Sequence, residues 1–369
     1  MNIPKEVKEI VSILNKEGFK AYPVGGCVRD ILVNKTPDDW DIATNAKPEE
    51  IQKLFPESVY ENNFGTVAIK TDSENKALKI IEVTTFRTEG EYSDKRRPDE
   101  IKFADKVEDD LARRDLTINA LALDIENDEI IDPFGGKKDL ENKIVKTVGD
   151  PDKRFQEDAL RLIRAVRFAV IPDFKFDKKT EESIKKNSNL LSHVAVERIK
   201  VEFEKIIMMP KAEKGVRLLQ ETGLLKNIVP ELEKGIGVSQ NEHHIYTVWE
   251  HNIRALKYSA EKGYSLEVRL ASLLHDVGKP KAKEGEGKKA TFHNHEIIGA
   301  NMAKKILKRL KFPNDVIKKV THLVRCHMFY YNVGEVSEAG VRRFLRKVGP
   351  ENVDDLIKVR EADRIGSGV

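Results

Sequence analysis

The stretch that decides the fold reads GGCVRD at residues 25–30, and DDWD follows it at residues 38–41. The glycine pair allows backbone amides to approach a phosphate because no Cβ atom stands in the way. If Asp39 and Asp41 lie on one strand, their carboxylates point to the same face. Mg²⁺ prefers oxygen ligands and is usually held by one or two carboxylates and by substrate phosphates. A DxD motif alone would also fit a surface turn, but its pairing with the glycine segment predicts a metal and triphosphate site.

The bulk composition indicates an ordinary globular protein. The chain has 369 residues, 40% of them hydrophobic and 34% charged, which suggests two or three domains. Its net charge of +3 is too small to indicate nucleic-acid binding by itself. No apolar run reaches the ~18 residues of a membrane span. The first residues lack the apolar core of a signal peptide. The two cysteines, Cys27 and Cys326, are far apart and form no CxxC motif. We therefore expect a cytoplasmic protein with reduced thiols and no membrane partner.

Periodicity predicts an α+β fold: a small mixed sheet with helices, followed by a region that is helical to the end. Residues 5–17 form an amphipathic pattern, and a polar loop is expected at 87–99. The strands expected in the first part are 20–24, 39–43, 65–70, 78–86 and 128–132, and its further helices are 28–33, 48–55 and 109–122. The helices expected after residue 140 are 154–171, 179–187, 195–208, 211–222, 246–260, 266–276, 295–311, 313–327, 338–347 and 350–363.

Two further groups of polar residues accompany the acids. Glu82 lies in an otherwise apolar strand, where a lone acid must be exposed or paired. It is either a plain exposed glutamate or a third acid that faces Asp39 and Asp41. Residues 110–120 read DLARRDLTINA. Their arginines would suit a phosphate and their Asp or Asn a sugar hydroxyl, although i,i+4 pairs on a solvated helix face would explain the segment equally well.

An acidic and basic stripe follows at residues 157–169, which read EDALRLIRAVRFA. Asp158, Arg161, Arg164 and Arg167 recur every three residues, so on a helix they form a slowly winding stripe. A carboxylate can accept from the exocyclic amine that C and A share, and a guanidinium can donate to a ring nitrogen or a carbonyl. Because U and G lack that amine at the equivalent position, the stripe predicts a preference for C and A. The alternative is a stripe that faces solvent.

Taken together, five motifs resemble the head and neck of class II tRNA nucleotidyltransferases, the CCA-adding enzymes of the polymerase β superfamily. The motifs are GGCVRD, DDWD, ARRDLTINALA, IIDPFGG and EDALRLIRAVRFA, and the resemblance covers roughly residues 20–230. It implies Mg²⁺ on Asp39 and Asp41, and with Glu82 these form the expected catalytic set. The residues expected to bind the nucleotide are Gly25, Gly26 and Arg29 at the triphosphate, Arg114 and Asp115 at the ribose, and Asp158, Arg161, Arg164 and Arg167 at the base.

The resemblance implies template-independent addition of C, C and A to the 3′ end of tRNA from CTP and ATP, with no DNA partner. Residues 87–98 resemble the flexible loop that this family links to the switch from C to A addition, which argues against a CC-only enzyme. Bacterial poly(A) polymerases share the head motifs but usually carry a basic element after the third carboxylate, which this chain lacks. Poly(A) synthesis and partial CC or A addition are therefore the alternatives.

The histidines indicate a second chemical centre, since eight of the nine lie between His243 and His327. Imidazole and carboxylate groups from separate helices commonly build a divalent metal site. In their order, the four expected ligands resemble the HD phosphohydrolase superfamily: His251, His275, Asp276 and Asp363. Their metal could be Mg²⁺, Mn²⁺, Ni²⁺ or Fe²⁺. Three further histidines either extend the site to a second metal or belong to the core or surface: His295, His322 and His327.

The expected organisation has three domains: a catalytic nucleotidyltransferase head at 1–140, a helical neck and body that binds the base and the tRNA at 141–237, and an HD metal-dependent phosphohydrolase domain at 238–369. An HD phosphohydrolase with a degenerate head and a non-catalytic RNA-binding module are the remaining alternatives. The chain ends soon after Asp363, whereas related enzymes usually continue into a helical tail. We therefore expect a short member of the family or a shortened chain, and the sequence gives no indication of its oligomeric state.

Overall fold

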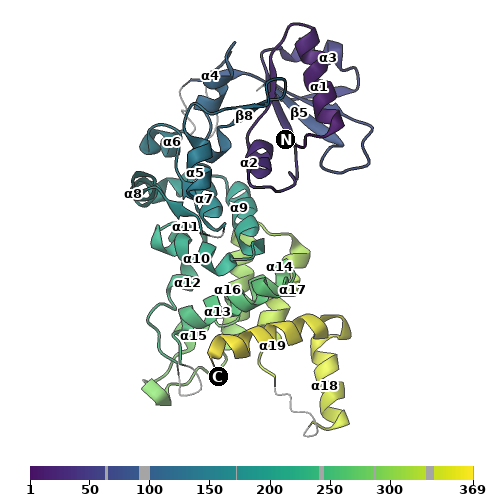
Figure 1. The fold of residues 1–369 in the computed structure, drawn as a ribbon. Coiled ribbons are helices and arrows are strands. Elements are labelled where there is room, and N and C mark those ends of the chain that lie inside the picture. Colours follow the sequence, from purple (N-terminus) through teal and green to yellow (C-terminus); the bar gives the residue numbers. More distant parts are fainter. Residues whose placement is uncertain are drawn as a thin grey trace. The chain divides into compact units, whose positions relative to one another are not determined.

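The computed structural model describes residues 1–62, 65–90, 100–171, 173–240, 245–285, 287–329 and 336–368. The chain forms two compact units. The first comprises Met1–Arg161 with Asp173–Asn187, and the second comprises Leu162–Pro172 with Ser188–Val369. The first unit is a mixed sheet with helices and the second is helical, which confirms the predicted α+β fold class (Figure 1).

A five-stranded sheet is the centre of the first unit, with the strand order β1-β2-β5-β4-β3. Strands β2 and β5 are parallel, and the other neighbouring pairs are antiparallel. Because residues along a strand point alternately to opposite faces, Ile81 and Val83 lie on one face of β5 and Glu82 on the other. The strands of this sheet are β1 (Ala21–Pro23), β2 (Asp41–Thr44), β3 (Ser58–Asn62), β4 (Thr66–Lys70) and β5 (Ile80–Thr85).

Helices α1 (Lys5–Lys16) and α3 (Pro48–Leu54) cover the apolar face of this sheet (Figure 1). Helix α1 contributes an apolar stripe at helical spacing, which packs with Ile51 of α3 and with Ile81 and Val83 of β5. The opposite face carries Glu82 and, on β2, Asp41 and the buried Ala43. The buried residues of the α1 stripe are Val7, Ile10, Val11 and Leu14.

Short elements complete the first unit. Some were not expected from the sequence. The predicted loop 87–99 begins with strand β6, which pairs with β7 beyond the end of the loop. Residues 91–99 of the predicted loop lie outside the described chain. The remaining elements are α2 (Gly26–Leu32), β6 (Arg87–Glu89), β7 (Ile101–Phe103), α4 (Val107–Ala112), η1 (Thr117–Asn119), β8 (Ala122–Asp124), β9 (Glu129–Ile131), α5 (Gly136–Glu141), β10 (Ile144–Val145), α6 (Pro151–Glu157), β11 (Lys175–Phe176) and α8 (Lys178–Asn187).

The helix expected over 109–122 is wrong in its second half. Helix α4 ends at Ala112, and a 3₁₀ turn and strand β8 follow. The Oδ1 atom of Asp115 accepts hydrogen bonds from the backbone N of Leu116 at 2.8 Å and from Nδ2 of Asn119 at 3.2 Å. Such bonds between a short polar side chain and nearby donors compete with helical hydrogen bonds. The segment therefore turns, instead of continuing as a helix.

The single helix expected over 154–171 is also wrong, because the structure has two. Helix α6 begins after Asp150, whose side chain accepts from the backbone N of Asp152 and Lys153, and Pro151 occupies its first turn. The chain is extended at Asp158, and α7 (Leu160–Ala169) begins after it. The Oδ1 atom of Asp158 accepts from the backbone N of Leu160 at 3.0 Å. Asp158 therefore lies between the helices, not on the helix of the arginines.

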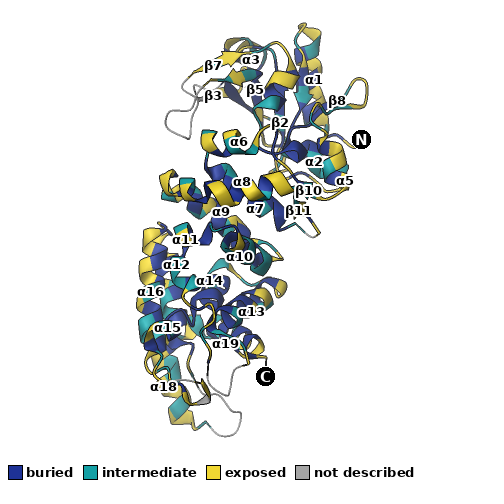
Figure 2. Ribbon diagram, turned by 90° about the vertical axis from the view of Figure 1, so that its left-hand side faces the viewer, coloured by how far each residue is buried: buried dark blue, intermediate teal, exposed yellow. Residues whose placement is uncertain are grey.

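The second unit is a helical core in which α13, α14 and α19 pack together, and Figure 2 shows buried residues along these helices. The helices expected here are confirmed, with ends shifted by a few residues. They are α9 (Val196–Met208), α10 (Ala212–Glu221), α13 (Val248–Glu261), α14 (Leu266–Leu274), α16 (His295–Arg309), α17 (Asn314–Cys326), α18 (Glu338–Val348) and α19 (Val353–Ser367). The unit also has short helical elements that were not predicted as separate helices: η2 (Ser188–His193), α11 (Leu225–Ile228), α12 (Pro230–Glu233), α15 (Lys279–Ala282), η3 (Gly287–Lys289) and η4 (Pro350–Asn352).

In the described parts of the chain, no helix has the length and apolar character needed to cross a membrane.

Candidate functional site

The glycine pair lies among three of the polar residues singled out from the sequence. Gly25 precedes α2 with φ +77° and ψ −124°, a conformation that side chains disfavour. A Cβ atom at Gly25 would lie 2.5 Å from Nη1 of Arg114. At Gly26, a Cβ atom would lie 3.7 Å from Nη2 of Arg29 and 4.0 Å from Oδ1 of Asp39. The fold therefore requires glycine at position 25 and brings two arginines and one acid to the pair.

The three acids expected in this region come from two strands and the segment before one of them. Strand β2 begins at Asp41, so the expected strand over 39–43 starts two residues late and Asp39 lies in a bend. Glu82 of β5 is directly opposite Asp41 in the parallel register, so both side chains point to the same face. Burial and the nearby charge of Asp39 raise the pKa of the Asp41 carboxyl, while Arg114 opposes the increase. Carboxylates that repel each other in this way would be stabilised by a bound cation.

Arg29 and Asp115 are connected through a residue that was not assigned to the site. The Nη1 atom of Arg29 donates to Oδ1 of Asn119 at 2.6 Å, and its Nε and Nη2 donate to Asp30 at 2.9 and 2.8 Å. The same Asn119 donates to Asp115, which is only 9% exposed. Asn119 was visible in the motif at 110–120 as a side chain suited to a sugar hydroxyl, but spacing alone could not place it beside Arg29.

Asp158 and Arg161 belong to the first unit. The Nη1 atom of Arg161 donates to Oε2 of Glu157 at 2.5 Å, and its Nη2 donates to the backbone O of Arg113 at 3.2 Å. Arg161 is thus attached to the residue next to Arg114. Glu157 was assigned no role from the motif, although it immediately precedes Asp158 there.

Arg164 and Arg167 belong to the second unit, because the boundary between the units falls within α7, after Arg161. The Nε atom of Arg167 lies 2.8 Å from Oε2 of the buried Glu202, and its guanidinium lies 4.6 Å from the centre of the Phe168 ring. Arg164 is half-buried. Arg167 is therefore held by the carboxylate of Glu202 and by the ring of its neighbour Phe168.

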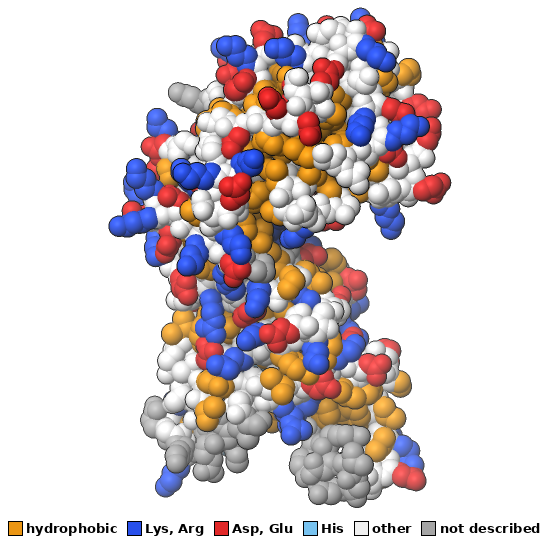
Figure 3. Space-filling view, in the orientation of Figure 1, with side chains coloured by type: hydrophobic (Ala, Val, Ile, Leu, Met, Phe, Trp, Pro, Cys, Tyr) orange, Lys and Arg blue, Asp and Glu red, His pale blue; other side chains and the backbone are white. Residues whose placement is uncertain are grey.

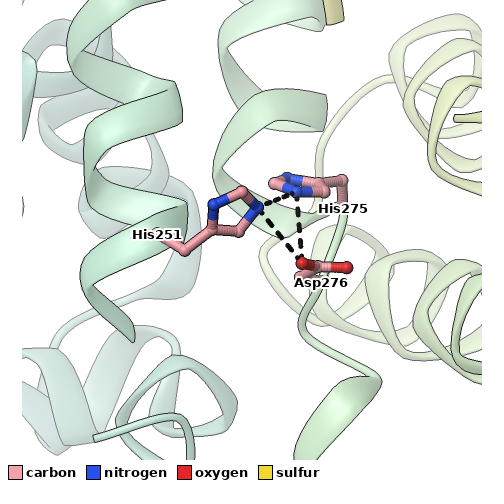
Figure 4. A group of neighbouring side chains, drawn as sticks. All are labelled: His251, His275 and Asp276. Carbon is pink, nitrogen blue, oxygen red and sulfur yellow. Dashed lines mark hydrogen bonds and ion pairs between the residues drawn. The ribbon is translucent and has the colours of Figure 1, made fainter. Parts of the chain in front are cut away.

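A second cluster lies in the second unit, where the four expected HD ligands meet. Figure 4 shows three of them, His251, His275 and Asp276. The Nε2 atoms of His251 and His275 are 2.8 Å apart. His251 Nε2 is 3.2 Å from Oδ2 of Asp276 and 3.2 Å from Oδ1 of Asp363, and His275 Nε2 is 3.4 and 3.6 Å from the same atoms. Ligands about 2.1 Å from one metal ion are separated by roughly 3.0 to 3.4 Å. The donor set and its spacing therefore fit a divalent metal.

A second potential metal group shares one residue with the first. His295 and His327 approach Oδ1 of Asp276 with their Nε2 atoms, at 3.4 and 3.7 Å. Their Nδ1 atoms lie 2.8 and 2.7 Å from the backbone O of Phe292 and Val324, and donation there leaves the Nε2 lone pairs facing the cluster. Within the described chain, His295 Nε2 and both Asp276 oxygens lack a hydrogen bond of normal geometry. Such buried acceptors fit metal ligands.

His322, the third histidine left open, is directed elsewhere. Its Nε2 lies 2.7 Å from the backbone O of Val348 and 4.0 Å from Sγ of Cys326. Among the described residues, the groups able to hold a metal do not include it. A residue that the sequence reasoning missed is Lys279, whose Nζ lies 2.7 Å from Oδ2 of Asp276 and donates to Gln240 at 2.6 Å. Its place in the HDVGK motif could have revealed it.

The electrostatics of the HD cluster also favour positive charge. Burial alone would lower the pKa of His275, but the carboxylates of Asp276 and Asp363 raise it to about 10. Burial would raise the pKa of Asp276, yet the charges of Lys279 and His275 hold it well below its usual range. Burial and the charge of His275 lower the pKa of His327 to about 3. The two buried carboxylates, Asp276 and Asp363, therefore attract positive charge, which a bound cation would supply.

The HD cluster opens into a cavity of about 600 Å³. Asp276, Asp363, His295 and His327 line it on the side of the cluster. Other parts of its wall carry positive and aromatic side chains, which would suit a phosphorylated ligand: Lys279, Arg360, Arg364 and Phe292.

Three protein-family models match the chain in succession. They describe a poly A polymerase head domain at residues 21–146, a probable RNA and SrmB-binding site of polymerase A at 173–236, and an HD domain at 248–366. The head cluster and the HD cluster each lie within a matched region.

Curated relatives and solved structures give the same picture. The CCA-adding enzyme of Geobacillus sp. (strain WCH70) is 46% identical over 216 residues, which are 58% of this chain and 52% of that protein. The CCA-adding enzyme of Bacillus subtilis (strain 168) is 44% identical over 220 residues, or 59% and 54%. The chain thus spans about half the length of the curated relatives that it matches. The crystal structure of the Bacillus stearothermophilus CCA-adding enzyme in complex with CTP is similar over 98% of this chain and 78% of that one, with 31% identity and a TM-score of 0.74.

Proposed function

The chain belongs to the family of CCA-adding enzymes, and we propose from this membership that it adds C, C and A to the 3′ end of tRNA, using CTP and ATP. The observation that carries the proposal is the meeting of Asp41 and Glu82 in one strand register, with Asp39 and Arg29 beside the glycine pair. This arrangement offers carboxylates for metal and cations for phosphate at one place. The relatives that bear this name support the same activity.

The residues of the first unit suit nucleotidyl transfer in defined roles. Arg29 would bind the triphosphate, whose β- and γ-phosphates leave as pyrophosphate when the 3′-oxygen bonds to the α-phosphorus. Arg114 and Asp115, the latter hydrogen-bonded to Asn119, would contact the ribose. Asp158 and Arg161 would read the base by hydrogen bonds, joined by Arg164 and Arg167. Catalysis of this kind depends mainly on positioning and on stabilisation of developing charge.

Both a nucleotidyltransferase head and an HD domain generally use divalent metal ions. We propose Mg²⁺ for the head, held by Asp39 and Asp41, because carboxylates and phosphates are the ligands that Mg²⁺ prefers. The bound ion would activate the attacking hydroxyl and neutralise charge on the phosphates. The raised pKa of Asp41 fits this assignment, since a carboxylate destabilised by burial and by its neighbour is one that gains from a cation.

An RNA partner is supported by positive charge in the first unit. On the face drawn in Figure 3, Lys and Arg side chains gather over the region of α6 and α8. Helix α8 carries four lysines in ten residues, although Lys185 and Lys186 pair with Glu181 and Asp152. Charges of this kind bind phosphates without regard to sequence. Because tRNA and both nucleotides are cytoplasmic, we place the protein there.

The test replaces one proposed metal ligand. We expect Asp41→Asn to reduce incorporation of CTP into a tRNA that lacks its last three nucleotides by more than about 100-fold. The exposed neighbour Asp38 provides the matched control, and Asp38→Asn should leave the rate within about twofold. Asp41→Asn should not lower the free energy of unfolding, because the fold already disfavours the charged form of Asp41. Nucleotide addition by Asp41→Asn at the wild-type rate would refute the assignment.

The length of the added sequence is tested separately. Wild-type protein is incubated with tRNA lacking one, two or three terminal nucleotides, with CTP and ATP supplied singly and together. A complete CCA end in the last case supports full addition, whereas products that stop after two cytidines indicate a CC-adding enzyme. Long adenosine tails would indicate poly(A) synthesis.

We propose a second activity for the HD cluster, metal-dependent hydrolysis of phosphate esters. The carrying observation is that Asp276 joins two groups of potential ligands at the edge of a cavity with cationic walls. The metal would be Mn²⁺, Ni²⁺ or Fe²⁺ in preference to Mg²⁺ alone, because imidazole ligands suit these ions better. Release of phosphate from a chromogenic phosphate ester in the presence of each metal tests the proposal. Asp276→Ala should abolish this activity and leave nucleotide addition unchanged.

A further inference from the structure

Alternating acidic and basic side chains form a connected chain in the first unit, beside the glycine pair. Glu89 and Asp110 supply its carboxylates, with side-chain exposures of 7% and 0%. Carboxylates at such depth are unfavourable unless they are paired and hydrogen-bonded. Three guanidinium groups provide the pairing: Arg87, Arg113 and Arg114.

Glu89 attaches Arg113 to strand β6. Its Oε1 atom accepts from Nε and Nη2 of Arg87 at 3.1 and 3.0 Å, and from Nη1 of Arg113 at 3.2 Å. Arg87 and Glu89 are the two ends of β6, which pairs with β7. The guanidinium of Arg113 is therefore held from one side by a strand that carries none of the proposed nucleotide contacts.

Asp110 holds Arg113 from the other side and connects it to Arg114. Its Oδ1 atom accepts from Nε and Nη2 of Arg113 at 2.9 and 2.7 Å, and its Oδ2 accepts from Nη2 of Arg114 at 3.4 Å. Burial raises the pKa of Asp110, but Arg113 and Arg114 outweigh it and bring the pKa below its usual value. The other nitrogen of Arg114 faces Gly25. The chain of contacts thus ends at the glycine pair.

Arg113 also contacts the residue proposed to read the base. Its backbone O accepts from Nη2 of Arg161 at 3.2 Å. Arg113 therefore lies between a proposed ribose contact, its neighbour Arg114, and a proposed base contact, Arg161. A shift of Arg113 would move both.

We propose that Glu89 is a positioning residue for the incoming nucleotide, which acts through Arg113 on Arg114 and Arg161. The inference rests on the proposed nucleotidyltransferase function and adds to it Glu89, to which no nucleotide contact was assigned. Glu89 belongs to β6, at the start of the segment 87–98 that resembles the family's flexible loop. Without the carboxylate of Glu89, the contacts left to the guanidinium of Arg113 among the residues that the structure describes are those with Asp110. Misplacement of a positioning group by about 1 Å can lower a rate by up to about 100-fold.

The test compares Glu89→Gln with Glu100→Gln. Glu100 is exposed, and its carboxylate lies 3.8 Å from Lys102 of the same ribbon, so its variant removes a charge without touching Arg113. We expect Glu89→Gln to lower kcat/KM for CTP and ATP by about 10-fold and to narrow the discrimination against UTP and GTP. Glu100→Gln should change neither by more than about twofold.

A purely structural role would give a different result. If Glu89 had a structural role alone, Glu89→Gln would have a lower thermal midpoint than the wild type. Its KM and nucleotide preference would be unchanged at a temperature where the variant is folded. This outcome overturns the inference. If Glu89→Gln does not fold, the same measurements are made on Arg113→Lys. Lysine keeps the positive charge of Arg113 but cannot make its forked contacts with Glu89 and Asp110, so the same results support or overturn the inference. A wild type that adds no nucleotide overturns the proposed function and the inference together. An active wild type with an unaffected Glu89→Gln overturns the inference alone.

Discussion

Gly25→Ala is the substitution whose effect can be worked out most fully from the structure. The backbone at Gly25 has a positive φ of +77°, so alanine there would be strained by about 1–3 kcal/mol. The added Cβ would also lie 2.5 Å from Nη1 of Arg114, whereas ordinary contacts begin at 3.4 Å. The guanidinium must therefore move by about 1 Å, away from the place where we expect it to contact the ribose of the nucleotide.

A matched control separates these two effects. Gly18 has a φ of +87°, and a Cβ there meets no atom within 4 Å. Gly18→Ala should consequently show the backbone strain alone, about 1–2 kcal/mol. Both variants should unfold at lower urea concentration than the wild type. Only Gly25→Ala should lose nucleotide addition, by about 100-fold in kcat/KM for CTP, since a misplacement of about 1 Å can have this effect.

A double variant tests the cause directly. In Gly25→Ala with Arg114→Ala, the side chain that would be displaced is absent, so the double variant should be no slower than Arg114→Ala alone. The reasoning is refuted if Gly25→Ala adds CTP at the rate of Gly18→Ala. It is also refuted if the two single effects multiply in the double variant, because Arg114 would then not transmit the effect of the Cβ atom.

Three more predictions concern acid stability, base selection and metal content. The pKa of Asp110 is lower in the folded protein than its ordinary value of about 4, so the ionised form stabilises the fold above about pH 4. This stabilisation is lost as the pH falls. Asp110→Asn should therefore unfold at lower urea concentration than the wild type at pH 7, and the difference should be smaller at pH 3. Joint replacement of Asp158 and Arg161 by alanine should relax discrimination against UTP and GTP in single-nucleotide incorporation, and an unchanged preference would contradict the base-reading role. After dialysis against Mn²⁺, elemental analysis should give up to two ions in the second unit for the wild type, one for His295→Gln and none for Asp276→Asn. Equal metal content in the three proteins would disprove the shared site.

Local patterns in the sequence were sufficient for much of the fold. The stripe of α1 follows from apolar residues at helical spacing, because one buried face stabilises a helix whatever its partner. Local patterns were insufficient where polar side chains form hydrogen bonds with the nearby backbone. Asp115 turns the chain after α4, and Asp158 separates α6 from α7, although the surrounding residues have a helical pattern.

The candidate site divides in the same way. The motif at 25–30 and the HD dipeptide were recognisable because their chemistry depends on residue types at fixed short spacing. Glu89, Asn119 and Lys279 were not assigned, since each acquires its meaning from a partner that is distant in sequence or on another element. A lone glutamate or lysine has many possible environments, and only the packed chain selects one of them.

From the sequence, the motifs indicated the family by resemblance, periodicity indicated the order of sheet and helices, and residue types indicated the acids and imidazoles that could hold metal. The folded chain was needed to show that Glu82 is opposite Asp41 and that Arg113 is held between two buried carboxylates. It was also needed to show that, among the described residues, Asp276 belongs to two groups of potential ligands while His322 belongs to neither. Strand register, burial and ion pairing arise from contacts between segments far apart in the sequence, and no local pattern records their geometry.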